Sequence, residues 1–143
     1  MRFMIIAAAA ILAVTSIPAD AQPSANAPFA CETLVHRQTL GGSPPITARV
    51  LKQTYTPGKP PLMHRHKVGE VVYVLSGSGT NTMNGKTTAL TPDRAVIVPA
   101  GTEHAIAGTG STGVTVISVQ ISDATSPWFK IRNSNKPLKA CRD

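Results

Sequence analysis

Four side chains that commonly bind metals occur at short spacing in the middle of the chain. His64 and His66 are separated by one residue, Glu70 follows four residues later, and His104 lies beyond the turn-forming segment Pro99–Gly101. On a β-strand, residues two apart point to the same side, about 7 Å apart, so the first two imidazoles can converge on one ion. Three imidazoles and one carboxylate suit a divalent transition metal: Mn, Fe, Co, Ni, Cu or Zn. Because no thiolate belongs to the set, we expect a centre with exchangeable positions rather than a closed structural zinc site.

The elements that must position these residues are predicted to be short β-strands. Runs rich in Val, Ile and Thr alternate with Gly- and Pro-containing turn signals, and no amphipathic helix of convincing length is present. Asn84-Gly85 is the sharpest signal, because both residues tolerate the positive φ of a type I′ hairpin turn. Nine closely spaced strands indicate a closed barrel or a sandwich. The predicted strands are Thr33–Gln38, Ile46–Tyr55, Leu62–His66, Glu70–Leu75, Thr80–Met83, Lys86–Leu90, Ala95–Val98, Glu103–Ala107 and Val114–Ile121.

The last of these strands carries two apolar patterns. Val114 and Val116 share one face, whereas Ile117, Val119 and Ile121 share the other. Either both faces are buried or a bulge changes the register, and the residues leave both explanations open.

The motif spacing resembles that of the cupin family. The first cupin motif is matched at every position, by Gly58, His64, His66, Glu70 and Gly77. The second is matched by Pro99, Gly101 and His104, but Asp93 replaces its leading glycine and Gly108 its terminal asparagine. The two departures concern turn geometry rather than metal ligands. The motifs and the segment between them cover residues 58–108, and the double match is far more specific than an isolated His-x-His.

This resemblance implies an all-β fold, an antiparallel double-stranded β-helix (jelly-roll) barrel. It also implies one divalent transition metal in the lumen, bound by His64, His66, Glu70 and His104. Single-domain cupins are similar to dioxygenases, decarboxylases and sugar isomerases. Our first hypothesis is a metal-dependent oxidoreductase of the dioxygenase type acting on a small oxygenated compound, with Glu70 as the catalytic carboxylate. The alternatives are a cupin isomerase or decarboxylase, and a non-catalytic periplasmic protein that binds a small molecule or a metal.

The N-terminus is predicted to be an export signal. Arg2 precedes an apolar run from Phe3 to Val14, Pro18 follows, and Ala19-Asp20-Ala21 is a small-x-small cleavage pattern. Twelve apolar residues are too few to span about 30 Å of hydrocarbon comfortably, so an uncleaved anchor is disfavoured. We expect a periplasmic or secreted protein without integral membrane contact.

The mature chain is long enough for one domain only. Its partition is predicted as a signal peptide over 1–21, a spacer and first strand over 22–45, a barrel over 46–121 and a basic segment over 122–143. The net charge is +7. No series of aromatic residues accompanies this charge, so we expect a small-molecule ligand or substrate and no nucleic acid. A homodimer is left open.

The two cysteines, Cys31 and Cys141, bracket almost the whole mature chain. In an oxidising compartment this isolated pair predicts a disulfide that ties the C-terminal segment to the barrel, with free buried thiols as the alternative.

Overall fold

The computed structural model describes residues 30–123, 130–131 and 139–141, and strands make up most of this part of the chain. The strands are β1 Ala30–Gly41, β2 Ile46–Tyr55, β3 His64–Arg65, β4 Glu70–Met83, β5 Lys86–Leu90, β6 Ala95–Val98, β7 His104–Asp123, β8 Lys130–Ile131 and β9 Lys139–Ala140. The predicted leader, the spacer through residue 29 and most of the basic C-terminal segment lie outside the described residues. No helix in the described ranges is long and apolar enough to cross a membrane.

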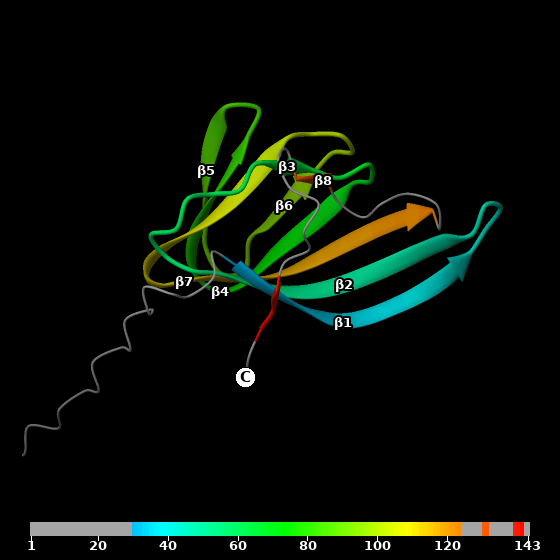
Figure 1. Cartoon of the computed structure of the whole chain (residues 1–143), viewed down its shortest axis with the longest axis horizontal. Coiled ribbons are helices and arrows are strands. Elements are labelled where there is room, and N and C mark those ends of the chain that lie inside the picture. Colours follow the sequence, from blue (N-terminus) through cyan, green and yellow to red (C-terminus); the bar gives the residue numbers. More distant parts are fainter. Residues whose placement is uncertain (1–29, 124–129, 132–138, 142–143) are drawn as a thin grey trace, which may run out of the picture.

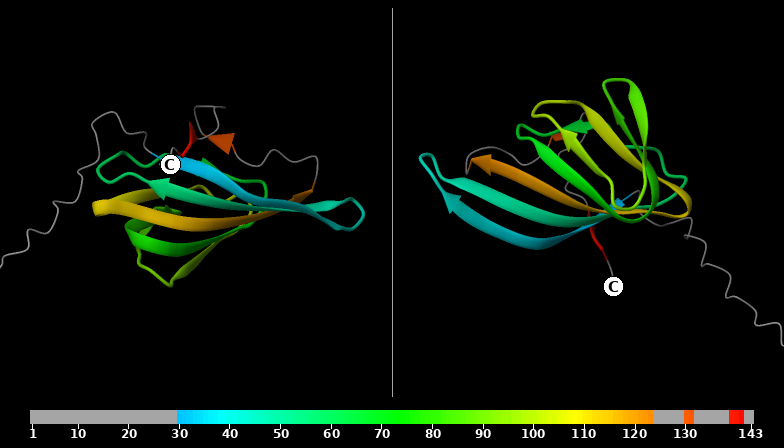
Figure 2. Two further views of the ribbon diagram at one scale, coloured as in Figure 1. Left: turned by 90° about the horizontal axis from the view of Figure 1, so that it is seen from below. Right: turned by 180° about the vertical axis from the view of Figure 1, so that it is seen from behind.

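Two long strands, β4 and β7, organise the fold (Figure 1). They pair antiparallel with each other, and the sheet runs in the order β5-β4-β7-β2-β1-β9. The first residues of β4 also pair with β6 and its last residues with β5, while the start of β7 pairs with β3. Each long strand therefore contributes to two curved surfaces that face each other. The β1–β2 hairpin extends away from the half of the molecule that contains β5 and β6 (Figure 2). The predicted all-β jelly-roll barrel is confirmed.

The interior of the barrel is divided between apolar and polar side chains. The apolar cluster includes Tyr55, Val72, Val74, Leu90, Ile106, Val114 and Val116. The buried polar residues include His66, Glu70, His104, Ser118 and Gln120. Because burying polar groups costs free energy unless they find partners, the polar region is where a functional site is expected.

The predicted bounds of β2, β5 and β6 are confirmed, but two predicted strand breaks are wrong. Residues 77–79 lie inside β4, and residues 108–113 lie inside β7. Gly77 adopts a φ of +78° at a register shift, and an added Cβ at Gly79 would collide with Val114. These glycines let two strands bend past each other closely instead of ending them. The pairing of β4 with β7 passes directly from Thr109 to Val114, so residues 110–113 form a bulge within the longer strand.

The second half of β7 alternates regularly between the interior and the outer face. Its pairing with β2 shows no register shift from Val114 to Asp123, but its pairing with β4 shifts by one residue between Val116 and Thr115, opposite Val74 and Ser76. Ile121 is 50% exposed, which excludes burial of both faces. Burial of both faces is therefore wrong, and the register shift in this stretch places the extra residue on the partner strand β4. The inward positions after Val116 are instead polar, namely Ser118 and Gln120.

The predicted Cys31–Cys141 disulfide is present. It joins the start of β1 to the residue that follows β9, and these two strands pair in parallel. The Cys141 amide also donates a hydrogen bond to the Glu32 carbonyl oxygen, at 3.3 Å. Residues 139–141 are thus attached to the barrel by backbone pairing and by a covalent bond.

Candidate metal centre

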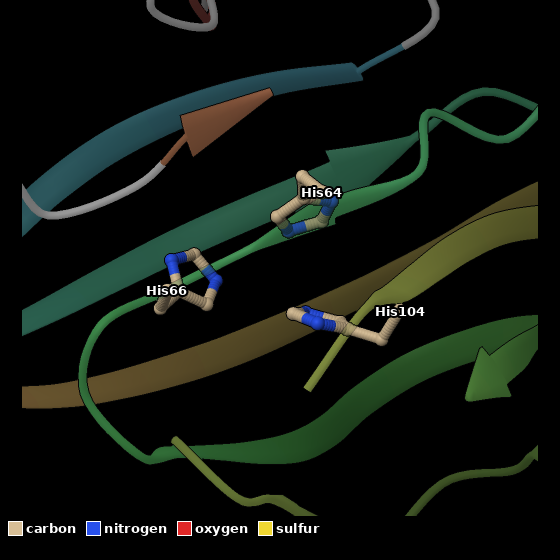
Figure 3. A group of neighbouring side chains, drawn as sticks. All are labelled: His64, His66 and His104. Atoms are coloured by element: carbon tan, nitrogen blue, oxygen red, sulfur yellow. The ribbon is translucent and has the colours of Figure 1, made fainter. Parts of the chain in front are cut away.

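The strand register brings three histidines together at the polar end of the barrel. His64 is the first residue of β3 and pairs directly with His104, the first residue of β7. His66 follows β3 by one residue. The ring centroid of His64 lies 4.2 Å from that of His104 and 5.0 Å from that of His66. One ring nitrogen from each histidine can be chosen so that all three lie within 4.8 Å of one another (Figure 3).

A turn before β7 fixes two of these residues. The Thr102 amide donates to the Pro99 carbonyl oxygen at 3.1 Å, and Gly101, with a φ of +74°, closes the turn. The Gly101 amide donates to the His66 carbonyl oxygen at 2.7 Å. The Pro-x-Gly segment thus links His66 to the strand that begins with His104.

The two departures from the second motif leave the local geometry intact. Asp93 has a φ of +62°, a left-handed conformation that Asp tolerates better than most residues, and its carboxylate accepts a hydrogen bond from the Tyr73 hydroxyl at 2.7 Å. An added Cβ at Gly108 would collide with the carbonyl oxygen of Tyr55, so the backbone packing here requires glycine.

Backbone carbonyls orient two of the imidazoles. His64 Nδ1 lies 2.9 Å from the Leu62 carbonyl oxygen, and His104 Nδ1 lies 3.2 Å from that of Thr102. A carbonyl oxygen only accepts hydrogen bonds, so Nδ1 carries the proton in both rings. In the neutral form of each ring, Nε2 then has the lone pair that a metal ligand needs.

Glu70 begins β4 and faces two of these histidines. Its Oε2 atom lies 3.2 Å from His104 Nε2 and 3.3 Å from His66 Nε2. A neutral His104 ring with its proton on Nδ1 would set a lone pair against this carboxylate. A proton or a metal cation must therefore lie between them, and the donor set fits a cation.

The other carboxylate oxygen of Glu70 is held by β7. Ser118 Oγ donates a hydrogen bond to Oε1, and Gln120 Nε2 donates another at 2.9 Å. Glu70 and Gln120 are register partners, so their side chains project to the same face. Our sequence reasoning missed Ser118 and Gln120. Their parity with the inward-facing Val116 was the signal that could have identified them.

The protonation states of the site suit metal binding. Burial, together with the nearby His104 ring, lowers the pKa of His64 to about 4, so this imidazole is neutral near pH 7. Burial alone would raise the pKa of the Glu70 carboxyl, but hydrogen bonds with His104 and His66 outweigh it and hold that pKa well below its usual value. The site thus offers a neutral imidazole beside an ionised carboxylate.

A small cavity of about 30 Å³ adjoins His64 and His66. Gln120, Gln53, Glu32 and Arg49 also line it. Its volume is enough for about one water molecule, so an exchangeable ligand of that size has room beside the histidines.

The fourth histidine of the chain, His36, is not part of this cluster. It lies exposed on β1, 3.3 Å from the Gln38 side-chain oxygen. Arg65, between His64 and His66, and Glu103, just before His104, form a partly exposed ion pair at 3.8 Å.

Comparison with known proteins agrees with this architecture. Residues 51–120 match the family model described as a cupin domain. No curated protein matches the chain. An uncharacterised protein with a double-stranded β-helix domain from Klebsiella pneumoniae has a TM-score of 0.60 at 19% identity, covering 79% of this chain and 90% of that one.

Two further solved structures are similar. KdgF from a Halomonas species has a TM-score of 0.54 at 15% identity, covering 68% of this chain and 84% of that one. Salicylate 1,2-dioxygenase from Pseudoaminobacter salicylatoxidans has a TM-score of 0.56 at 19% identity, covering 79% of this chain but 31% of that one. At these identities the likeness shows the fold. The chain thus has the barrel fold of these proteins, and its residues 51–120 match the cupin domain model.

Proposed function

We propose that this protein is an exported, metal-dependent cupin enzyme, an oxidoreductase of the dioxygenase type that acts on a small oxygenated compound. The observation that carries the proposal is the buried cluster of three imidazoles with Glu70 Oε2 set against two of them. Burying such a polar cluster in the barrel costs free energy unless its groups are paired or bind an ion.

Under this proposal His64, His66, Glu70 and His104 hold one divalent transition metal. When bound, the metal supplies Lewis acidity and redox chemistry to a substrate oxygen and to dioxygen. The carbonyls of Leu62 and Thr102 keep two imidazoles in the ligating tautomer.

Glu70 has a second role in the proposal. It is the anionic member of the set, and Oε2 faces the histidines while Oε1 is held by Ser118 and Gln120. Because Oε1 stays held by Ser118 and Gln120 and three imidazoles remain as ligands, Oε2 can give up its place as a ligand and accept a substrate proton. We therefore assign Glu70 as the proton acceptor.

The reaction type is the least specific part of the proposal. Similar folds include the salicylate 1,2-dioxygenase and a DMSP lyase from Ruegeria pomeroyi, so this barrel accommodates both oxygenation and lyase chemistry in other proteins. The predicted export signal favours oxygen chemistry over isomerisation of phosphosugars, which are cytoplasmic substrates.

The test begins with protein purified from its native compartment. Elemental analysis should find one transition metal per chain, and a His64→Ala/His104→Ala double variant should lose it. The metal-loaded protein should consume oxygen with at least one compound from a panel of enolic, catecholic and sugar-acid substrates. Conversion without oxygen uptake would favour an isomerase or decarboxylase, and binding without conversion would favour a non-catalytic binding protein. Stoichiometric metal in the double variant would refute the assigned site.

A further inference from the structure

A row of inward-facing side chains continues from Glu70 across the barrel to β2. Glu70 pairs with Gln120 on β7, and Gln120 pairs in turn with Arg49 on β2. Direct partners on neighbouring antiparallel strands project to the same face of a sheet. Arg49 therefore lies on the same inner face of the barrel as the proposed metal ligand Glu70.

Arg49 lines the small cavity of the proposed metal centre. This cavity of about 30 Å³ is also lined by His64, His66 and Gln120. The Arg49 side chain is 16% exposed and that of its partner Glu32 is 22% exposed, so both charges are largely buried while solvent still reaches them. A charge in such a place interacts more strongly with a neighbouring ion than a charge surrounded by water does.

A chain of hydrogen bonds holds Glu32 beside Arg49. Glu32 Oε1 lies 3.9 Å from an Arg49 guanidinium nitrogen, and Glu32 Oε2 accepts a hydrogen bond from Gln53 Nε2 at 3.3 Å. The Tyr55 hydroxyl donates to Gln53 Oε1 at 3.2 Å. The backbone of Glu32 is held as well, because its carbonyl oxygen accepts the Cys141 amide. The ion pair is thus a fixed part of the cavity wall.

The pairing with Glu32 leaves Arg49 able to bind a ligand. A guanidinium carries five N–H donors in a planar fork that matches the geometry of a carboxylate. The separation of 3.9 Å between Arg49 and Glu32 is longer than a hydrogen bond. Arg49 can therefore keep Glu32 as its ionic partner and still donate hydrogen bonds to an anion in the cavity.

The charges around the cavity favour an anion once a divalent ion is bound. The ion and Arg49 together carry one more positive charge than Glu70 and Glu32 carry negative, and imidazole ligands are neutral. Burial lowers the pKa of Arg49, Glu32 opposes this shift, and the like charge of Arg37 adds to it. Arginine nevertheless stays charged near pH 7. A negatively charged ligand would balance the excess.

We propose that Arg49 makes the metal centre selective for a carboxylic acid, with the guanidinium binding the substrate carboxylate and one carboxylate oxygen entering the cavity beside His64 and His66. The cavity has room for about one water-sized group, which suits a single oxygen atom. The body of the acid then lies toward the partly exposed side of the ion pair. The inference rests on the proposed function, because it names the substrate class of the same site.

The test compares acids with neutral amides of nearly the same shape. The protein is loaded with Co²⁺ and its metal content is measured. Acetate and benzoate are then titrated against acetamide and benzamide, by calorimetry and by the visible absorption of Co²⁺. At least one acid should bind about 10-fold more tightly than its amide. Equal dissociation constants in both pairs, with stoichiometric metal bound, would overturn this inference alone, whereas a protein that binds no metal would overturn the proposed function as well.

Two substitutions with opposite expected effects assign the preference to Arg49. Arg49→Met should keep its Co²⁺ but bind the acid about 10-fold more weakly, with little change for the amide. Arg94→Met, the same change at an exposed arginine outside this cavity, should leave acid binding unchanged. Glu32→Gln should tighten acid binding at least about threefold, because it removes a negative charge from the cavity wall while its side-chain oxygen can still accept from Gln53.

The variants also define what would refute the role of Arg49. A folded Arg49→Met protein that binds the acid within about twofold of wild type would overturn the proposal. Loss of Co²⁺ from this variant would overturn it too, because Arg49 would then support the metal ligands instead of the substrate. If Arg49→Met does not fold, Glu32→Gln decides the question, and unchanged or weaker acid binding in that variant would refute the inference.

Discussion

The hydrogen bonds from β7 to Glu70 offer a quantitative test of how the centre is built. Ser118 and Gln120 both donate to Oε1, and Ser118 is fully buried. A hydrogen bond to a charged group contributes about 1.5–3 kcal/mol. Replacing Ser118 with alanine should therefore lower the free energy of unfolding of the metal-free protein by about 2 kcal/mol.

The same substitution should weaken metal binding. Removing a hydrogen-bond partner of a metal ligand commonly reduces affinity by about 10–100-fold. That range corresponds to about 1.4–2.7 kcal/mol, which agrees with the value expected for one charge-assisted bond. Gln120→Leu, which removes the other donor with little change in size, should have an effect of similar magnitude.

The assay combines urea unfolding of the metal-free protein with competitive titration of Zn²⁺ and Ni²⁺ against a chelator. Thr115→Val is the matched control, because Thr115 lies on the same strand and its hydroxyl pairs with Thr54 at 3.2 Å, outside the histidine cluster. We expect the control to lose about 1 kcal/mol of stability or less and to keep wild-type metal affinity. A folded Ser118→Ala protein that binds both metals within twofold of wild type would refute the proposal that Ser118 positions Glu70 as a ligand.

Three further predictions follow from the site and the termini. Glu70→Gln should reduce turnover more than metal content, and equal activity per bound metal would remove Glu70 from the mechanism. In a Cys31→Ser/Cys141→Ser variant the free energy of unfolding should fall by about 5 kcal/mol, because the disulfide restricts the unfolded chain by closing a loop with a sequence separation of 110. An unchanged urea midpoint would contradict this prediction. The exported protein should begin at Gln22, and an intact mass that includes Met1 would show that the leader is retained.

The parts of the fold that could be predicted from the sequence are those where local turn chemistry agrees with the hydrophobic pattern. Asn84 and Gly85 both have positive φ between β4 and β5, as their residue types indicate, and β5 has the predicted bounds. The errors fall at glycines whose role depends on tertiary contacts. Gly79 resembles a turn residue in sequence, yet it lies inside β4 because a side chain there would collide with Val114 on β7. Local pattern alone cannot separate these two uses of glycine.

The candidate site divides in the same way. Spacing alone singled out His64, His66, Glu70 and His104, because metal ligands must be of a few residue types at compatible separations. Ser118 and Gln120 were missed, because a serine or glutamine in a strand of Val and Ile carries no chemical signal of its own and is marked only by its parity with Val116. Their role depends on which face of β7 is inside, and the outward-facing Ile117, Val119 and Ile121 made that face ambiguous.

The inner face of β7 explains how one strand serves both halves of the barrel interior. Val114 and Val116 pack into the apolar cluster, and the next inward positions, Ser118 and Gln120, donate to Glu70. Because β7 pairs with both β2 and β4 along this stretch, neither side chain can turn outward without a register slip that would also expose the two valines. The packing of the apolar half thus fixes the donors of the polar half. These donors leave Glu70 Oε2 directed at the histidines, so the same strand register that builds the core also orients the carboxylate of the proposed metal centre.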